Sequence, residues 1–144
     1  MLNNNIIVIR GHAGSYKSNL AQILINSISN RKCCYIDLDI NKNLKLNEDI
    51  TLYQDNIKDF SVIEEIVNKN EVIVLDYLSL LNLFINENDL LHKLCVLVKK
   101  SKKTLIAVEC ISCNRDILLS DEKYEVLKSN ADLVITLDRN LITI

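Results

Sequence analysis

The chain has 144 residues and a formal net charge of −2, and 49% of its residues are hydrophobic and 25% charged. This size and balance suit one domain with a core of its own, and the weak negative charge argues against a broad nucleic-acid-binding surface. The longest apolar run, residues 72–85, is too short to span a membrane, no signal-peptide pattern opens the chain, and the five cysteines form no disulfide-like framework, so we expect a cytoplasmic protein.

The predicted elements alternate between strand and helix. In chain order they are strand 5–10, helix 17–29, strand 32–39, a short strand at 50–53, helix 60–67, strand 71–76, helix 90–98, strand 104–110, a helix from a Ser120 cap through Leu127, strand 131–138 and a closing hairpin strand at 141–144. The main strands are continuously apolar, as strands buried on both faces are. The sequence therefore predicts a single α/β domain over residues 1–144, with a mostly parallel sheet, helices on both faces and a C-terminal antiparallel strand.

The stretch RGHAGSYKSN, residues 10–19, joins the first strand to the first helix and contains the only two glycines of the chain. A phosphate-binding loop needs converging backbone N–H groups, a helix N-terminus and a cation, and this stretch offers all three. Lys17 would reach the β- and γ-phosphates, and Ser18 would bind Mg²⁺. The predicted nucleotide-binding residues are Gly11, His12, Ala13, Gly14, Ser15, Tyr16, Lys17, Ser18 and Asn19. The alternative is a tight strand-to-helix turn without a ligand.

Tyr16 stands directly before the lysine, where such loops normally have glycine. A side chain at this position costs about 1–3 kcal/mol of strain if the loop keeps its usual geometry. We therefore expect Tyr16 to have a positive φ, or the loop to be remodelled locally. Its ring should turn away from the phosphate cavity, because a ring that pointed inward would fill the space of the β-phosphate.

Three aspartates follow buried strands of the predicted sheet. Asp76 ends strand 71–76, where P-loop folds carry the acid that assists Mg²⁺, and buried strands rarely keep an aspartate without a partner. Asp37 and Asp39 end strand 32–39, and strand alternation predicts that both point to one face. Either of these two could orient an attacking water. The alternatives are a helix cap for Asp76 and a solvated strand end for the other two.

These segments resemble the ATPase core of the DnaB-type replicative helicases, within the RecA-like P-loop ATPases. EVIVLDYLSLL looks like their Walker B strand, CYIDLDIN falls where their second strand ends in a catalytic glutamate, and KKTLIAVECISCNR is similar to their sensor strand. LSDEKYEVLKSNADLVITLDRN is similar to the run that closes their core. The resemblance implies a three-layer P-loop NTPase with a five-stranded RecA-like sheet, which binds ATP and Mg²⁺ and hydrolyses ATP.

The resemblance also implies roles for individual residues. Asp39 takes the place of the catalytic glutamate, with a side chain one methylene shorter, and acts together with Lys17; Ser18 and Asp76 hold the metal. The sensor glutamine of the family falls near Glu109 or Cys110. A link to DNA replication or recombination, and a homo-oligomer or a related ATPase as partner, follow from the same likeness. We do not expect a free-standing processive helicase, because the DNA-binding loops are neither glycine-rich nor basic.

Two other interpretations stay open. The first loop together with YIDLDINKNL is also similar to the ParA/MinD partition ATPases, whose second strand ends in Asp-x-Asp, although His12 stands where they have an early lysine. The other is a catalytically weakened or inactive P-loop module that acts by assembly with a partner ATPase. Tyr16 is the feature that motivates this second alternative.

Overall fold

A computed structural model describes residues 5–12, 14–28, 30–40, 43–54, 57–85, 89–111, 119–138 and 142–143. Strands and helices alternate along them as the sequence predicts. The elements are β1 (Ile6–Gly11), α1 (Lys17–Asn26), β2 (Cys33–Asp37), β3 (Thr51–Tyr53), α2 (Phe60–Lys69), β4 (Val72–Asp76), α3 (Leu78–Phe84), α4 (Leu90–Lys100), β5 (Thr104–Cys110), α5 (Asp121–Asn130), β6 (Leu133–Leu137) and β7 (Ile142–Thr143).

The strands form one seven-stranded sheet in the order β3-β2-β4-β5-β1-β6-β7. The pairs from β3 to β6 are parallel, and β7 pairs antiparallel with β6. The predicted mostly parallel sheet and its antiparallel C-terminal strand are thus confirmed. The two strands beyond the five main ones are β3 and β7, which the sequence predicts as short additions.

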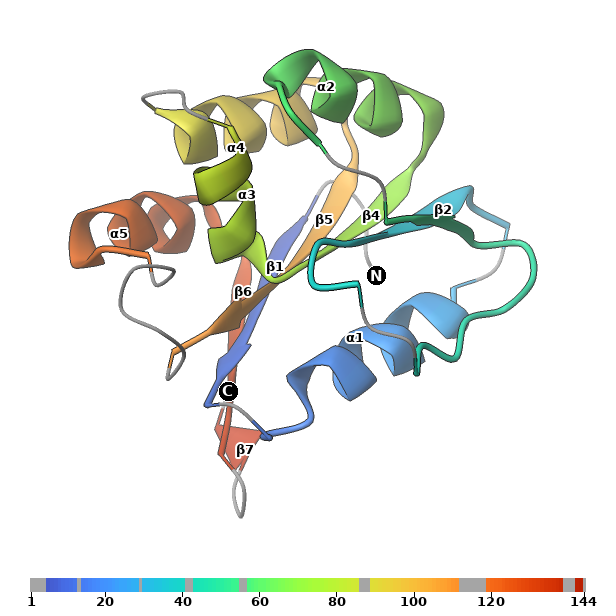
Figure 1. Cartoon of the computed structure of the whole chain (residues 1–144), viewed down its shortest axis with the longest axis horizontal. Coiled ribbons are helices and arrows are strands. Elements are labelled where there is room, and N and C mark those ends of the chain that lie inside the picture. The colour runs from blue at the N-terminus through green and yellow to red at the C-terminus, as the bar shows by residue number, and fades with distance from the viewer. Residues whose placement is uncertain are drawn as a thin grey trace.

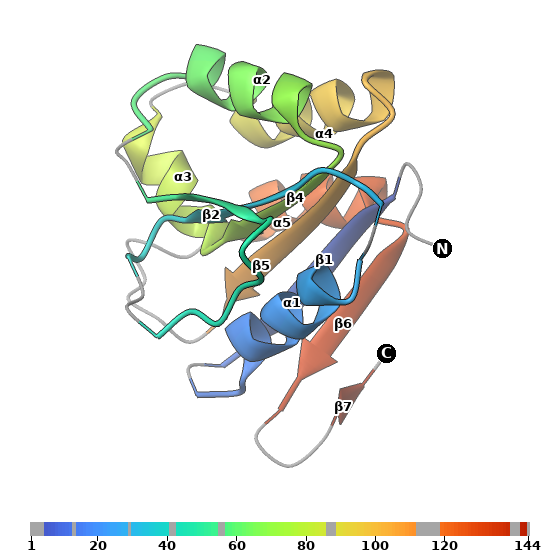
Figure 2. The ribbon, with the colours of Figure 1, turned by 90° about the vertical axis from the view of Figure 1, so that its right-hand side faces the viewer.

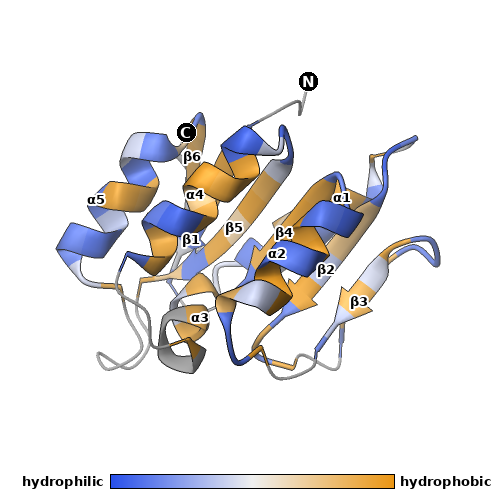
Figure 3. Cartoon of the chain, turned by 90° about the horizontal axis from the view of Figure 1, so that it is seen from above, coloured by the Kyte–Doolittle hydropathy of each residue, from blue (hydrophilic) through white to orange (hydrophobic). Residues whose placement is uncertain are grey.

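The helices cover the two faces of the sheet unequally (Figures 1 and 2). Helix α1 lies on one face, and α2, α3, α4 and α5 lie on the other. Successive residues of a strand pack into two separate hydrophobic cores, one on each face of the sheet. Ile7 and Ile9 of β1 pack with α1, whereas Ile6 and Val8 pack in the cluster of the four other helices. Both faces of the sheet are therefore apolar, and the helices are amphipathic, as the colours of Figure 3 show.

Segment 43–50 completes the layer on the α1 face. Leu44, Leu46 and Ile50 belong to the same core cluster as α1. Gln22 of α1 accepts a hydrogen bond from the backbone N–H of Lys45, at 2.9 Å. This part of the predicted loop between β2 and β3 is therefore fixed against the first helix.

Several boundaries differ from the predicted ones for local reasons. Helix α1 ends at Asn26 and not at residue 29, with Ser27 as its C-cap. Strand β2 ends at Asp37, because residues 38 and 39 form a turn and Ile40 has a φ of 51°. The predicted Ser120 cap is confirmed, since its side chain accepts a hydrogen bond from the N–H of Lys123.

Helix α3 has no counterpart among the predicted elements. It begins one residue after β4, and its N-cap, Tyr77, has a φ of 67° and no capping side-chain hydrogen bond. The sequence LSLLNLF therefore carries no start signal, and it continues the apolar run of the strand before it. Among the described residues, no helix is both long enough and apolar enough to cross a membrane.

Candidate functional site

The two glycines of the loop after β1 are needed for different reasons. A Cβ on Gly11 would lie 2.7 Å from the carbonyl oxygen of Leu137 on β6 and would also collide with the side chain of Ser15. Gly14 has open space around it but a φ of 78°, which side chains rarely adopt. Gly11 thus permits close packing of the loop on the sheet, and Gly14 permits its turn. Ala13 of the predicted nucleotide site lies outside the described residues.

Tyr16 has a φ of 64° and a ψ of 24°, in the left-handed region. The prediction of a positive φ is confirmed. Its side chain is 70% exposed, so the ring is not buried inside the loop. The carbonyl oxygen of Tyr16 accepts a hydrogen bond from the N–H of Leu20 at 3.0 Å, and α1 begins with the next residue, Lys17. Tyr16, in its left-handed conformation, therefore forms the N-cap of α1 and accepts a hydrogen bond from its first turn.

Lys17 and Ser18 link the loop to its surroundings. The Lys17 ammonium donates a hydrogen bond to the carbonyl oxygen of His12, at 3.2 Å. The Ser18 hydroxyl donates one to Oδ1 of Asp76, at 3.2 Å, across 58 residues of sequence. The fold thus brings the predicted metal-binding pair together. Asn19 lies on the exposed side of α1.

The carboxylate of Asp76 is held from two sides. The side chain is 5% exposed, and its second oxygen, Oδ2, accepts a hydrogen bond from the hydroxyl of Tyr35 on β2. Burial raises the pKa of Asp76, and the hydrogen bonds from Tyr35 and Ser18 oppose this rise. The two donors therefore help to keep the buried group as a carboxylate.

Asp37 and Asp39 occupy different environments. Asp37 lies beside Asp76 in the register of β2 and β4, is 1% exposed, and accepts a hydrogen bond from the Gln54 side chain at 2.8 Å. Asp39 lies beyond the end of β2 and is exposed. Partial desolvation and the charge of Asp37 raise the pKa of Asp39, whereas the charge of Lys17 lowers it. The position of Asp39 in the turn leaves it open to solvent, within the electrostatic range of Lys17.

Strand β5 lies between β1 and β4 in the sheet, so its carboxyl end lies between the end of β1, where the loop begins, and the end of β4, which carries Asp76. Glu109, at this end, is 2% exposed and stands opposite Arg10 of β1 in the strand register. No hydrogen bond of good geometry reaches either of its carboxylate oxygens from the described residues. Burial raises the pKa of Glu109 to about 7, and Ser79 and Arg10 oppose the rise only in part.

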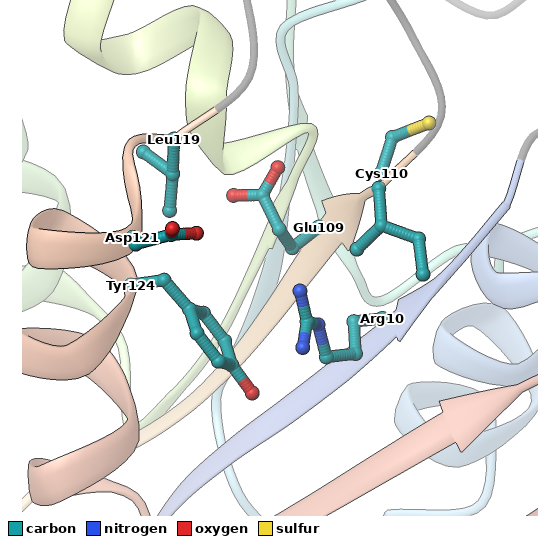
Figure 4. Close-up of a pocket in the computed structure, with 7 residues that line it drawn as sticks. Arg10, Glu109, Cys110, Leu119, Asp121 and Tyr124 are labelled. Carbon is teal, nitrogen blue, oxygen red and sulfur yellow. The ribbon is translucent and has the colours of Figure 1, made fainter.

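Glu109 and Arg10 border a cavity of about 150 Å³ on the face opposite α1 (Figure 4). The Arg10 guanidinium carbon lies 3.8 Å from the centre of the Tyr124 ring, a cation–π contact that connects β1 to α5. Among the described residues, none of the loop residues 11–19 lines the cavity. Its lining residues are Arg10, Glu109, Cys110, Ile111, Leu119, Asp121 and Tyr124.

Sequence reasoning missed Tyr35 and the pair of Arg10 and Tyr124. Strand alternation does place Tyr35 on the same face as Asp37, but only the strand order shows that Asp76 stands beside them. Tyr124 contacts Arg10 although the two residues lie 114 positions apart, and the sequence contains no signal that would pair them.

No protein-family model matches the sequence, and a comparison with curated protein sequences gives no match either. Solved structures do match. The flagellar accessory protein FlaH from Methanocaldococcus jannaschii has a TM-score of 0.76 and 16% identity, with 94% of this chain and 72% of that chain covered. A KaiC-like protein from Pyrococcus horikoshii has a TM-score of 0.71 and 13% identity, with coverage of 98% and 75%. A third structure, an isolated ATPase domain, has a TM-score of 0.65 and 14% identity, with coverage of 95% and 70%. The chain therefore has the RecA-like P-loop ATPase fold, which the sequence resemblance implied.

Proposed function

We propose that the protein binds ATP with Mg²⁺ at the loop of residues 11–19 and hydrolyses the terminal phosphoanhydride bond. The observation that carries the proposal is the hydrogen bond between Ser18 Oγ and Asp76 Oδ1. It joins the start of α1, the helix that follows β1, to the end of β4, and β5 lies between β1 and β4 in the sheet. The RecA-like fold supports the same interpretation. A DnaB-like role in replication or recombination is the more specific form of this proposal.

The loop and the start of α1 would hold the phosphates. Backbone N–H groups at a helix N-terminus attract anions, and Lys17 adds a full positive charge. In place of the carbonyl of His12, its ammonium would contact the β- and γ-phosphates. Ser18 and Asp76 offer a hydroxyl and a carboxylate, the hard oxygen ligands that suit Mg²⁺. The bound ion would neutralise charge on the phosphates, and these two residues would hold it.

Asp39 is the residue we assign to the attacking water. It lies past the end of β2, is exposed, and is within the electrostatic range of Lys17. Because its pKa is raised by partial desolvation and by the charge of Asp37, its carboxylate is more basic than that of an ordinary aspartate. It would orient the water and accept a proton from it as the oxygen attacks the γ-phosphorus.

Calorimetric titration with ATP and Mg²⁺ tests the binding step. The wild type should show saturable heat, and Lys17→Ala should lose it. Lys58→Ala, which removes an exposed lysine in the segment before α2, is the matched control and should bind like the wild type. Absence of saturable heat from a folded wild type would contradict the proposal. Phosphate release over many turnovers, lost in Asp39→Ala while nucleotide still binds, tests the hydrolytic step.

A second candidate function is an assembly module that docks onto a related ATPase or onto other copies of the chain. The observation that favours it is the exposure of two apolar side chains on and next to α1, Tyr16 at 70% and Ile23 at 64%. Tyr16 is the N-cap of α1, and Ile23 lies within the helix. Multiple-turnover phosphate release by the isolated protein, well above that of Lys17→Ala, would reject a module without catalysis.

A further inference from the structure

Tyr35 makes a contact that the proposed roles of Ser18 and Asp76 do not require. Its side chain is completely buried in β2, on the face that carries α1. The hydroxyl donates a hydrogen bond to Oδ2 of Asp76 on the neighbouring strand. In the register of the two strands Tyr35 stands beside Val74, so it reaches Asp76 diagonally, along the same face of the sheet.

Packing alone does not explain this hydroxyl. A phenylalanine would fill the same part of the core without carrying a polar group into it. A buried hydroxyl is unfavourable unless it is hydrogen-bonded, and a bond to a carboxylate is stronger than one to a neutral acceptor. The contact therefore fixes one specific oxygen of Asp76 in a known direction.

The two carboxylate oxygens of Asp76 therefore have different hydrogen-bond partners. Oδ2 is occupied by Tyr35, which belongs to the rigid centre of the sheet. Oδ1 is directed at Ser18, the first turn of α1 and the loop. Because Oδ1 contacts Ser18, it is the oxygen that would bind the metal ion beside this hydroxyl. A carboxylate without the Tyr35 contact could rotate and exchange the two oxygens.

We propose that Tyr35 is a positioning residue, whose hydroxyl holds Oδ2 of Asp76 and so keeps Oδ1 aimed at Ser18 and at the magnesium ion that this pair would bind. The inference rests on the proposed function, since it concerns the metal side of the same nucleotide site. In this role Tyr35 would touch Asp76 and neither the nucleotide nor the metal. It would influence the metal site only by fixing the orientation of the Asp76 carboxylate.

The first test is the magnesium dependence of nucleotide binding, measured with a fluorescent ADP analogue in EDTA and at increasing Mg²⁺. In Tyr35→Phe, binding in EDTA should stay within about twofold of the wild type, because the loop is untouched. The Mg²⁺ concentration that gives half of the binding enhancement should rise about tenfold, the size of effect expected for a lost hydrogen bond to a charged group. Tyr53→Phe, on the neighbouring strand β3, is the matched control and should not change either value.

The second test needs no nucleotide. In urea unfolding, the Tyr35→Phe variant should have a lower free energy of unfolding than the wild type, because Oδ2 of Asp76 loses its hydrogen-bond donor. In an Asp76→Ala background the same change should destabilise less, because the tyrosine hydroxyl there has already lost its carboxylate acceptor and keeps only its hydrogen bond with the Gln22 side chain. An equal destabilisation in both backgrounds would show that the contact is not formed and would overturn the inference.

The outcomes separate this inference from the proposed function. A wild type that binds no nucleotide, with or without Mg²⁺, contradicts the proposed function and the inference together. A wild type that binds with a clear Mg²⁺ dependence, and a Tyr35→Phe variant with the same dependence, contradict the inference alone. A weaker response to Mg²⁺ combined with non-additive stability supports both.

Discussion

Substitution of Glu109 by glutamine is expected to stabilise the protein at alkaline pH. The side chain is 2% exposed, and its oxygens lack hydrogen bonds of good geometry among the described residues. Ionisation is therefore resisted in the folded state, and burial raises the pKa from an ordinary value of 4.5 to about 7. Glutamine has the same shape and never carries the charge.

The sign and size of the effect follow from the two pKa values. Below about pH 4.5 the carboxyl is protonated in both the folded and the unfolded chain, and ionisation has no effect on the free energy of unfolding. As pH rises toward 7 the unfolded chain releases the proton first, so stability falls, and above about pH 7 the loss is constant. At about 1.36 kcal/mol for each pH unit of difference, the loss is about 3 kcal/mol.

Urea unfolding of the wild type and Glu109→Gln at about pH 4 and about pH 8 measures this loss. The two proteins should have similar stability at the lower pH, and the variant should gain about 3 kcal/mol at the higher one. Glu125→Gln, an exposed change on α5, should show no such pH-dependent gain. The reasoning would be refuted if the difference between wild type and Glu109→Gln were the same at both pH values, or if the variant were the less stable protein at the higher pH.

Three further predictions concern substitutions in the loop and at a helix end. Tyr16→Gly should raise the free energy of unfolding by about 1 kcal/mol, since glycine tolerates a φ of 64°, and should preserve or tighten nucleotide binding in calorimetry; lost binding would instead make the ring a ligand contact. Gly11→Ala should destabilise the protein more than Gly14→Ala in thermal unfolding, because its Cβ meets the Leu137 carbonyl whereas Gly14 meets only backbone strain; equal effects would refute the steric argument. Ser120→Ala should cost about 1 kcal/mol in urea unfolding through the lost cap of α5, and an unchanged midpoint would contradict this.

The parts of the fold that the sequence predicts well are those with local signals. Strands β1, β4 and β5 are continuous apolar runs, and the Ser120 cap announces α5. The loop is recognisable because the only two glycines of the chain stand in it, and because Lys17 and Ser18 open a helix with apolar periodicity. The parallel orientation of the strands follows from the alternation of strands and helices along the chain, because strands joined by crossover helices run in the same direction.

The features that sequence reasoning missed depend on which strands become neighbours. Nothing in the sequence states that β5 inserts between β1 and β4, and this order is what places Glu109 opposite Arg10. The contact of Tyr35 with Asp76 likewise requires that β2 and β4 pair in one particular register. Helix α3 was missed for another reason, because its positive-φ N-cap, Tyr77, is not a residue type that signals a helix start.

Six described residues other than glycine have a positive φ, and three of them flank the proposed site, whereas Asn30, Asp89 and Lys102 lie elsewhere in the chain. Three bulky residues, Tyr16, Ile40 and Tyr77, have φ values of 64°, 51° and 67°. Each stands next to one of the proposed site residues, in order Lys17, Asp39 and Asp76. For large side chains such conformations cost about 1–3 kcal/mol each, and they persist only where the surrounding structure determines them. Glycine, asparagine or aspartate at these positions would adopt the same φ values with less strain. The proposed roles of Lys17, Asp39 and Asp76 therefore predict that the strain at Tyr16, Ile40 and Tyr77 is retained to position these three side chains.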